Sequence, residues 1–117
     1  MISIVTSSRY TIDKKHLEHV AREYMGENEI PNDVSLNVVF VGARRMKQIS
    51  AQYKHDIIAH PVLTFSYRDD PQGEEKLIGE IFICYPQAIL LAAEKDKKVE
   101  DMMAFLVKHG IDNIMKS

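Results

Sequence analysis

The chain has 117 residues, of which 45% are hydrophobic and 27% are charged, and its formal net charge is −2. This size and composition are typical of one globular domain, here residues 1–117, and exclude the disordered and fibrous classes. Cys84 is the only cysteine, which excludes an intramolecular disulfide and a Cys/His zinc finger. Because the net charge is slightly negative, any binding of RNA requires a local basic surface.

The N-terminal residues 1–9 lack the basic start and the long apolar run of a secretory signal peptide. No apolar stretch approaches the length that spans a membrane. We therefore expect a cytoplasmic protein without membrane association.

The first quarter of the chain predicts a strand followed by a helix. Ile2, Ile4 and Val5 form a short β-prone segment. Apolar residues then recur at helical spacing over residues 12–25. Thr11 occupies a suitable N-cap position, and Gly26 stands where a C-terminal cap is expected.

A second strand and helix are predicted after the turn that begins at Pro31. Residues 34–41 alternate between apolar and polar before an apolar run, which indicates a strand. Residues 44–53 return to helical spacing. The other face of this helix is basic and polar, with Arg44, Arg45, Lys47 and Gln48.

The second half predicts a β-hairpin followed by helices. Residues 62–67 and 77–84 are β-prone, and the polar stretch 68–76 connects them. Gly79 inside the later strand indicates a bulge or a close approach. A helix starts near Pro86, and the charged stretch 94–101 is either a turn or solvated helix. The last helix, residues 102–111, is apolar on most sides, which indicates packing against a sheet.

Several stretches of the chain carry short motifs in a fixed order. They are a strand and helix over residues 38–54 that end in Gln-Tyr-Lys, then Val-Leu-Thr-Phe (62–65), Leu-Ile-Gly-Glu-Ile (77–81) and Ala-Phe-Leu-Val-Lys-His-Gly (104–110). In this order they resemble the YbeY family of bacterial rRNA maturation endoribonucleases. The family counterparts are a strand, helix and Tyr-Arg loop, the strands Val-Leu-Ser-Phe and Leu-Gly-Asp-Ile, and the start of the metal-binding helix.

The resemblance implies an α+β fold with a roughly four-stranded mixed sheet packed against helices and a central C-terminal helix. It also implies a single-strand-specific, metal-dependent endoribonuclease that acts in rRNA processing and ribosome assembly. The implied cofactor is zinc, and the implied partners are ribosomal RNA and the ribosomal subunit. The resemblance does not indicate an oligomeric state.

The metal motif of the family is His-Gly-x-x-His with a third histidine six positions later. His109 matches the first ligand, Asn113 stands at the second, and the third falls beyond Ser117. Residues four apart share a helix face, so two imidazoles there converge on one ion, whereas an Asn amide is a weak neutral ligand. Asp112 points about 100° away from that position. We therefore expect weak or no zinc binding and low intrinsic ribonuclease activity.

Lys54 stands at the position of the family arginine, which the resemblance places near the cleaved phosphate. Lysine supplies charge there but not a planar bidentate fork, and the alternative is an exposed loop lysine. Arg44, Arg45 and His60 are candidates for RNA contact, against the alternatives of a polar helix face and an ordinary loop histidine. Cys84 is interpreted as a small buried hydrophobic residue.

A second function remains open on these residues. Asn113 and Lys54 favour a non-catalytic RNA- or ribosome-binding module that keeps the fold but has lost the metal site. A shortened form of an active enzyme is a third alternative, although shortening does not account for Asn113.

Overall fold

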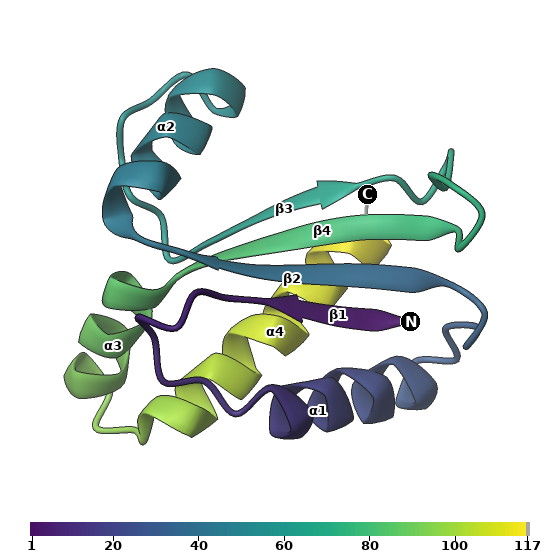
Figure 1. Ribbon diagram of the computed structural model, residues 1–117, viewed down its shortest axis with the longest axis horizontal. Helices are drawn as coiled ribbons and strands as arrows, with labels where there is room; N and C mark the ends of the chain where they lie inside the picture. Colours follow the sequence, from purple (N-terminus) through teal and green to yellow (C-terminus); the bar gives the residue numbers. More distant parts are fainter. Residues whose placement is uncertain (117) are drawn as a thin grey trace.

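The computed structural model describes residues 1–116, which form a four-stranded mixed sheet and four helices (Figure 1). This arrangement confirms the expected α+β fold. The elements in chain order are β1 (Ile2–Val5), α1 (Lys14–Glu27), β2 (Ser35–Val41), α2 (Ala43–Tyr53), β3 (Val62–Ser66), β4 (Leu77–Cys84), α3 (Tyr85–Glu94) and α4 (Val99–Lys116).

The strands are ordered β1-β2-β4-β3, so β1 and β3 are the edges of the sheet. β1 pairs with β2 and β2 pairs with β4 in parallel, whereas β3 runs antiparallel to β4. The antiparallel pair is the predicted hairpin, and the polar segment 68–76 is its connection. Within the part of the chain that the structure describes, no helix has the length and apolarity needed to cross a bilayer.

The two faces of the sheet are covered differently. Alternating side chains such as Val38, Ile81 and Ile83 point into the main hydrophobic core, which α1, α3 and α4 complete. A smaller cluster joins Met46 and Ile49 of α2 to the other face. In Figure 1, α4 passes behind the strands, and α2 stands apart from the other three helices. Within residues 1–116, the second face is therefore covered in part, by α2 and by Ala59 of the loop that follows it.

Two glycines bring α4 and β4 into close contact. A Cβ atom added at Gly110 of α4 would lie 2.7 Å from two carbon atoms of Ile81. A Cβ added at Gly79 of β4 would lie 2.5 Å from Ile114 Cδ1. The register of β2 with β4 also shifts where Leu36 pairs with Gly79. The two alternatives predicted for Gly79, a bulge and a close approach, are therefore both present.

The cap predictions for the first helix are wrong. α1 begins at Lys14, and the Asp13 side chain, not Thr11, caps it by accepting a hydrogen bond of 3.0 Å from the His16 amide. Aspartate is among the best N-cap residues, so the later cap defines the start. Gly26 lies inside the helix, and Asn28 is the C-cap.

The last helix begins earlier than predicted, at Val99 and not at residue 102. The charged stretch 94–101 contains a turn in which Asp96 has φ 51°, and its remaining residues extend α3 and α4. Glu100 and Asp101 lie in the first turn of α4, where negative charge is favourable for the helix dipole. Charge alone therefore did not distinguish turn from helix.

We predict that Gly110→Ala lowers the free energy of unfolding by about 1–2 kcal/mol, because an overpacked core costs about 1–3 kcal/mol and the better helix propensity of Ala offsets up to ~1 kcal/mol. Urea denaturation measures the change. Gly26→Ala is the matched control, since a Cβ there has no heavy atom within 4 Å. A Gly110→Ala protein as stable as the Gly26→Ala protein would contradict the close packing of α4.

Candidate functional site

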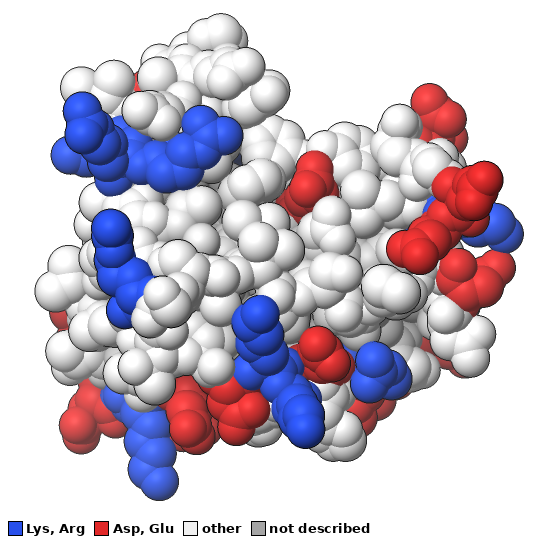
Figure 2. Space-filling view, viewed as in Figure 1, with Lys and Arg blue, Asp and Glu red and all other residues white. Residues whose placement is uncertain are grey.

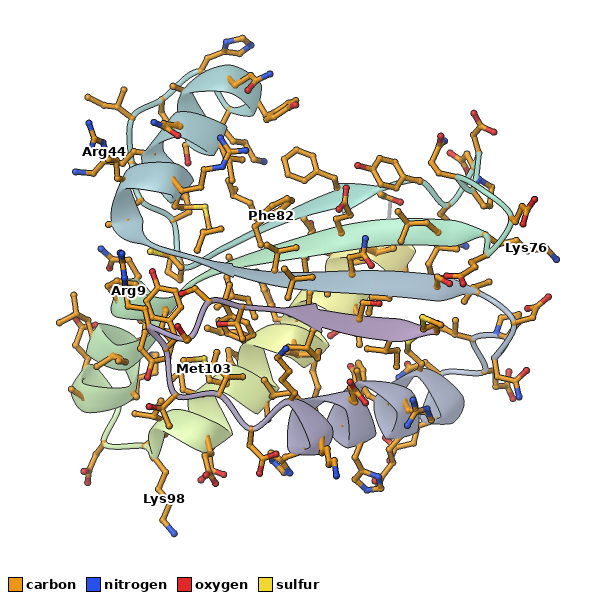
Figure 3. The ribbon with its side chains drawn as sticks, in the orientation of Figure 1. Arg9, Arg44, Lys76, Phe82, Lys98 and Met103 are labelled. Atoms are coloured by element: carbon orange, nitrogen blue, oxygen red, sulfur yellow. The ribbon has the colours of Figure 1, made fainter. Side chains whose placement is uncertain are left out.

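A groove of about 250 Å³ lies between α2 and the less covered face of the sheet. The register places Leu63 beside Phe82, and Phe65 beside Glu80, on this face. Phe82, labelled in Figure 3, lies between β4 and α2. The lining residues are Arg45, Ile49, Gln52, Tyr53, Phe65, Tyr67, Glu80 and Phe82.

Three aromatic rings form a connected series along this groove. The Tyr53 and Phe65 rings meet edge to face with centroids 4.9 Å apart, and Phe65 and Phe82 do so at 5.6 Å. Tyr53 is 55% exposed, so part of its ring is available to a ligand. Because α2 carries Tyr53 and the strands carry the two Phe residues, only the tertiary fold assembles this series.

Glu80 is fixed in the groove by two hydrogen bonds. The Tyr67 hydroxyl donates to Glu80 Oε1 at 2.8 Å, and Asn37 Nδ2 donates to Oε2 at 3.4 Å. Burial, the hydrogen bond to Glu80 and the charge of Glu80 raise the pKa of Tyr67 to about 12. Tyr67 is therefore a stable hydrogen-bond donor at neutral pH, and the carboxylate is its acceptor.

One end of the groove is basic. Arg44, Arg45 and Lys47 are exposed on α2, and the Arg45 guanidinium donates to Gln48 at 3.4 Å. Figure 2 shows Lys and Arg side chains over the α2 region and acidic side chains over the connection between β3 and β4. Arg44 lies on the outer side of α2 (Figure 3), and Arg45 lines the groove.

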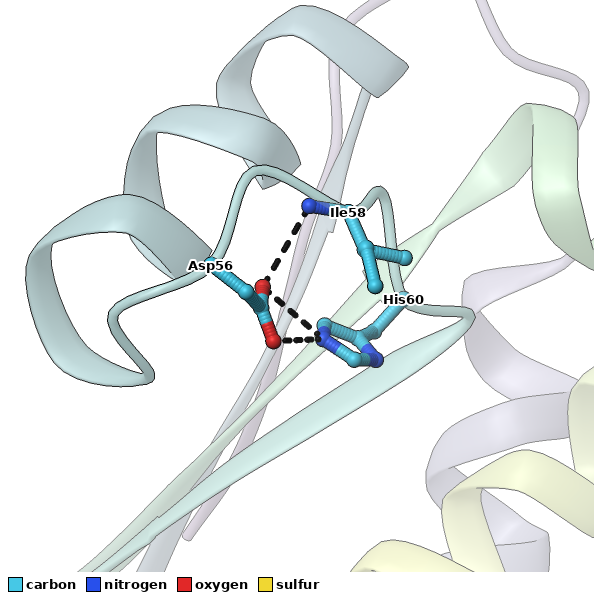
Figure 4. Close-up of polar contacts among 3 residues, drawn as sticks. All are labelled: Asp56, Ile58 and His60. Carbon is cyan, nitrogen blue, oxygen red and sulfur yellow. Dashed lines mark hydrogen bonds and ion pairs between the residues drawn. The ribbon is translucent and has the colours of Figure 1, made fainter.

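Lys54 and His60 lie in the segment that joins α2 to β3. Lys54 is the exposed C-cap of α2, next to Tyr53. His60 Nε2 lies 3.2 and 3.1 Å from the two carboxylate oxygens of Asp56, and the Ile58 amide donates to the same carboxylate at 3.3 Å (Figure 4). The His60 ring is therefore held by its own loop through Nε2.

The electrostatics of this loop follow from the same contacts. Burial acts to raise the pKa of Asp56, but the hydrogen bonds from His60 and Ile58 and the charges of His60 and Lys54 outweigh it. The net effect lowers the pKa of Asp56. An ionised Asp56 thus orders the loop beside Lys54.

The candidate metal residues lie on α4, which covers the opposite face of the sheet from α2. His109 is exposed and stacks on Phe105 with centroids 6.1 Å apart. Asp112 accepts a hydrogen bond of 2.7 Å from the Tyr24 hydroxyl of α1, so it is engaged away from His109. Within residues 1–116, no three His, Cys, Asp or Glu side chains converge as a metal site.

These donors do not fit the three-histidine site that the resemblance implied. His109 supplies one imidazole, and Asn113, half-buried on the same helix, supplies an amide oxygen that binds zinc weakly. No catalytic step is therefore derived through a metal ion.

The structure groups the predicted site residues differently from the sequence analysis. Arg45 lines the groove, and Lys54 directly follows Tyr53, which also lines it. His109 and Asn113 lie on α4, on the opposite face of the sheet. Five lining residues were not predicted from the sequence as members of a site: Tyr53, Phe65, Tyr67, Glu80 and Phe82. For Phe65, Tyr67, Glu80 and Phe82, the signal was the alternation along and just beyond β3 and along β4, which placed them on one face without showing that α2 leaves that face open.

We predict that the titration of Tyr67 makes the free energy of unfolding depend on pH. Its folded pKa of about 12 exceeds its ordinary value of 10.0, so the associated stability is complete below pH 10 and is lost as the pH rises toward 12. Urea denaturation should show a steeper loss in this range for the wild type than for Tyr67→Phe. Glu80→Gln should bring the Tyr67 pKa part of the way back to 10, as followed by phenolate absorbance. Identical phenolate titrations of the wild type and the Glu80→Gln protein would contradict the Tyr67–Glu80 contact.

The comparisons with known proteins agree on one family. The family model described as Endoribonuclease YbeY matches residues 3–114. An Endoribonuclease YbeY of Alkaliphilus metalliredigens is 31% identical over 71% of this chain and 56% of its own length. One of Mesoplasma florum is 25% identical, over 98% of this chain and 73% of its own. The chain thus spans between about half and three quarters of these relatives.

A solved structure agrees with the fold. The solution structure of a Thermotoga maritima protein matches with a TM-score of 0.62 and 27% identity, over 95% of this chain and 69% of that one. Together with the order of strands and helices, these matches show that the chain belongs to the YbeY endoribonuclease family.

Proposed function

We propose that this chain binds single-stranded RNA in the groove between α2 and the sheet, as part of an rRNA-processing factor. The observation that supports this most directly is the series of Tyr53, Phe65 and Phe82 beside the basic face of α2. Proteins that bind single strands combine aromatic stacking surfaces with positive charge along the backbone. Membership of an endoribonuclease family makes RNA the expected polymer.

The shape of the groove favours an unpaired base. Its volume of about 250 Å³ and its aromatic walls suit a flat ring inserted from solvent. Bases inside a duplex are stacked and paired, whereas bases of a single strand can be splayed out onto aromatic side chains. The groove therefore selects strands whose bases are free.

Charge favours one end of the face for the phosphates. A second hollow of about 370 Å³ on the same face is lined by Glu74 and Glu75, which repel a polyanion. Arg45 in the groove and Lys54, which follows Tyr53 in the chain, offer the opposite charge. A strand is therefore expected to follow α2 and to avoid the connection between β3 and β4.

The finer activity is proposed on family membership. It comprises cleavage of ribosomal RNA, zinc dependence and contact with the ribosomal subunit. His109 and Asn113 alone are a poor donor set for zinc. We therefore expect this chain to bind single-stranded RNA but to cleave it slowly.

We predict that Tyr53→Ala weakens binding of a short single-stranded RNA by about 5- to 150-fold, because base stacking on an aromatic ring contributes about 1–3 kcal/mol. Fluorescence anisotropy measures the dissociation constant. Tyr53→Phe keeps the ring and should bind as the wild type does. Arg45→Gln should reduce the slope of log affinity against log salt by about 0.7, since one phosphate contact is lost.

The control for this experiment is Phe105→Ala, which removes a ring that is 49% exposed on α4, outside the groove. It should leave binding unchanged. If Phe105→Ala weakens binding and Tyr53→Ala does not, the strand lies along α4, and the proposed groove is wrong.

We predict that Asn113→His raises zinc affinity by at least about tenfold, because two imidazoles four residues apart share one helix face. Isothermal titration calorimetry with zinc measures the change. Thermal unfolding of the apoprotein checks that the new side chain is tolerated. Adding His109→Ala to this variant should abolish the gain, since one imidazole remains.

The unmodified chain should bind zinc weakly and show little chelator-sensitive cleavage of a single-stranded rRNA fragment. Sub-micromolar zinc binding by the wild type, lost in His109→Ala, would show that other residues complete the site.

A further inference from the structure

The carboxylate of Glu80 is an unexpected group in a groove for a polyanion. Among the lining residues in the described part of the chain, it is the acidic one. A carboxylate repels phosphate. Its presence in the groove is therefore best explained by a ligand that donates hydrogen bonds to it. Tyr67 and Asn37 each use one of its oxygens. A carboxylate has about four acceptor sites, so each oxygen keeps capacity for one more donor.

Tyr67 and Asn37 also fix the orientation of the Glu80 carboxylate. Tyr67, just after β3, and Asn37, on β2, lie on opposite sides of β4 and bind different oxygens. The carboxylate is therefore held as a pre-oriented, two-oxygen acceptor beside the rings of Phe65 and Phe82. Fixed polar groups in an otherwise apolar pocket determine which ligand is accepted.

We propose that the groove selects an unpaired guanine, whose N1–H and N2–H donate to the two oxygens of Glu80. This inference rests on the proposed binding of single-stranded RNA and names the base that is recognised. Guanine presents two adjacent donors on its Watson–Crick edge. Adenine and cytosine present an amino donor beside a ring nitrogen that accepts, and uracil presents one N–H between two carbonyls. In these three bases, an acceptor faces a carboxylate oxygen and repels it.

Other side chains complete the recognition. The rings of Tyr53, Phe65 and Phe82 bind any base by stacking and do not discriminate between bases. Arg45 and Gln52 line the α2 side of the groove and carry donors for the guanine O6 or for the adjoining phosphate. Affinity thus comes from the rings and from Arg45, whereas selectivity comes from Glu80.

The test uses the full chain and a set of uridine oligonucleotides that differ at one central base: guanine, inosine, adenine, cytosine or uracil. We expect the guanine oligonucleotide to bind about tenfold more tightly than the others, as a bidentate contact discriminates by about 5- to 150-fold. Inosine lacks the N2 amino group and should lose most of this preference. Anisotropy measures all five dissociation constants.

Glu80→Gln is the matched variant, because it keeps the size of the side chain and removes the second acceptor oxygen. It should abolish the guanine preference, so that the five oligonucleotides bind this variant with similar dissociation constants. Thermal unfolding verifies its fold, and the five wild-type constants test the inference without any variant.

The outcomes separate this inference from the proposed function. Equal wild-type constants for all five oligonucleotides, together with weaker binding by Tyr53→Ala, would refute guanine selection and keep the groove. A guanine preference that survives Glu80→Gln would also refute it. Binding that is insensitive to Tyr53→Ala would overturn the proposed groove itself.

Discussion

The packing of α4 against β4 depends on two reciprocal glycine contacts. Gly110 on the helix makes room for Ile81 of the strand, and Gly79 on the strand makes room for Ile114 of the helix. Since Ile81 and Ile114 are almost fully buried, neither can move aside without opening the core. The close approach lets one central helix fill the main core together with α1 and α3.

This distribution of helices determines where a ligand can bind. Three helices cover one face of the sheet, so the apolar side chains of that face are buried in the main core. α2 covers only part of the other face, through Met46 and Ile49. Beyond that cluster, Phe65 and Phe82 remain half-buried, and the groove forms beside them. The groove is thus a consequence of unequal coverage of the sheet.

The two ends of the open face carry opposite charge. Exposed Arg and Lys residues on α2 lie at one end, and the acidic connection between β3 and β4 lies at the other. Glu80 lies between them and is tied to Tyr67 and Asn37. Net charge is slightly negative, yet a local basic surface exists beside the aromatic series, as binding of a nucleic acid requires.

The metal residues show a different relation between pattern and structure. Spacing alone indicated that His109 and Asn113 share a helix face, because α-helical geometry is local. The structure adds that Asp112 is bound to Tyr24 on the neighbouring helix, and that Phe105 stacks on His109. The donor chemistry of this face differs from that of the family motif, whereas the glycine that follows His109 packs against Ile81 of β4.

Local periodicity in the sequence was sufficient for the order and type of every helix and strand, and for the β3–β4 hairpin. These features depend on residues close together in the chain. The resemblance to the family came instead from short motifs such as residues 62–65 and 104–110. Periodicity misplaced the ends of α1 and α4, where Asp13 and Val99 set boundaries that spacing did not resolve. The order β1-β2-β4-β3 and the groove were decided by tertiary structure alone. Strand register and helix placement bring Arg45 and Tyr53 of α2 to the same groove as Glu80 of β4, and no local pattern encodes that placement.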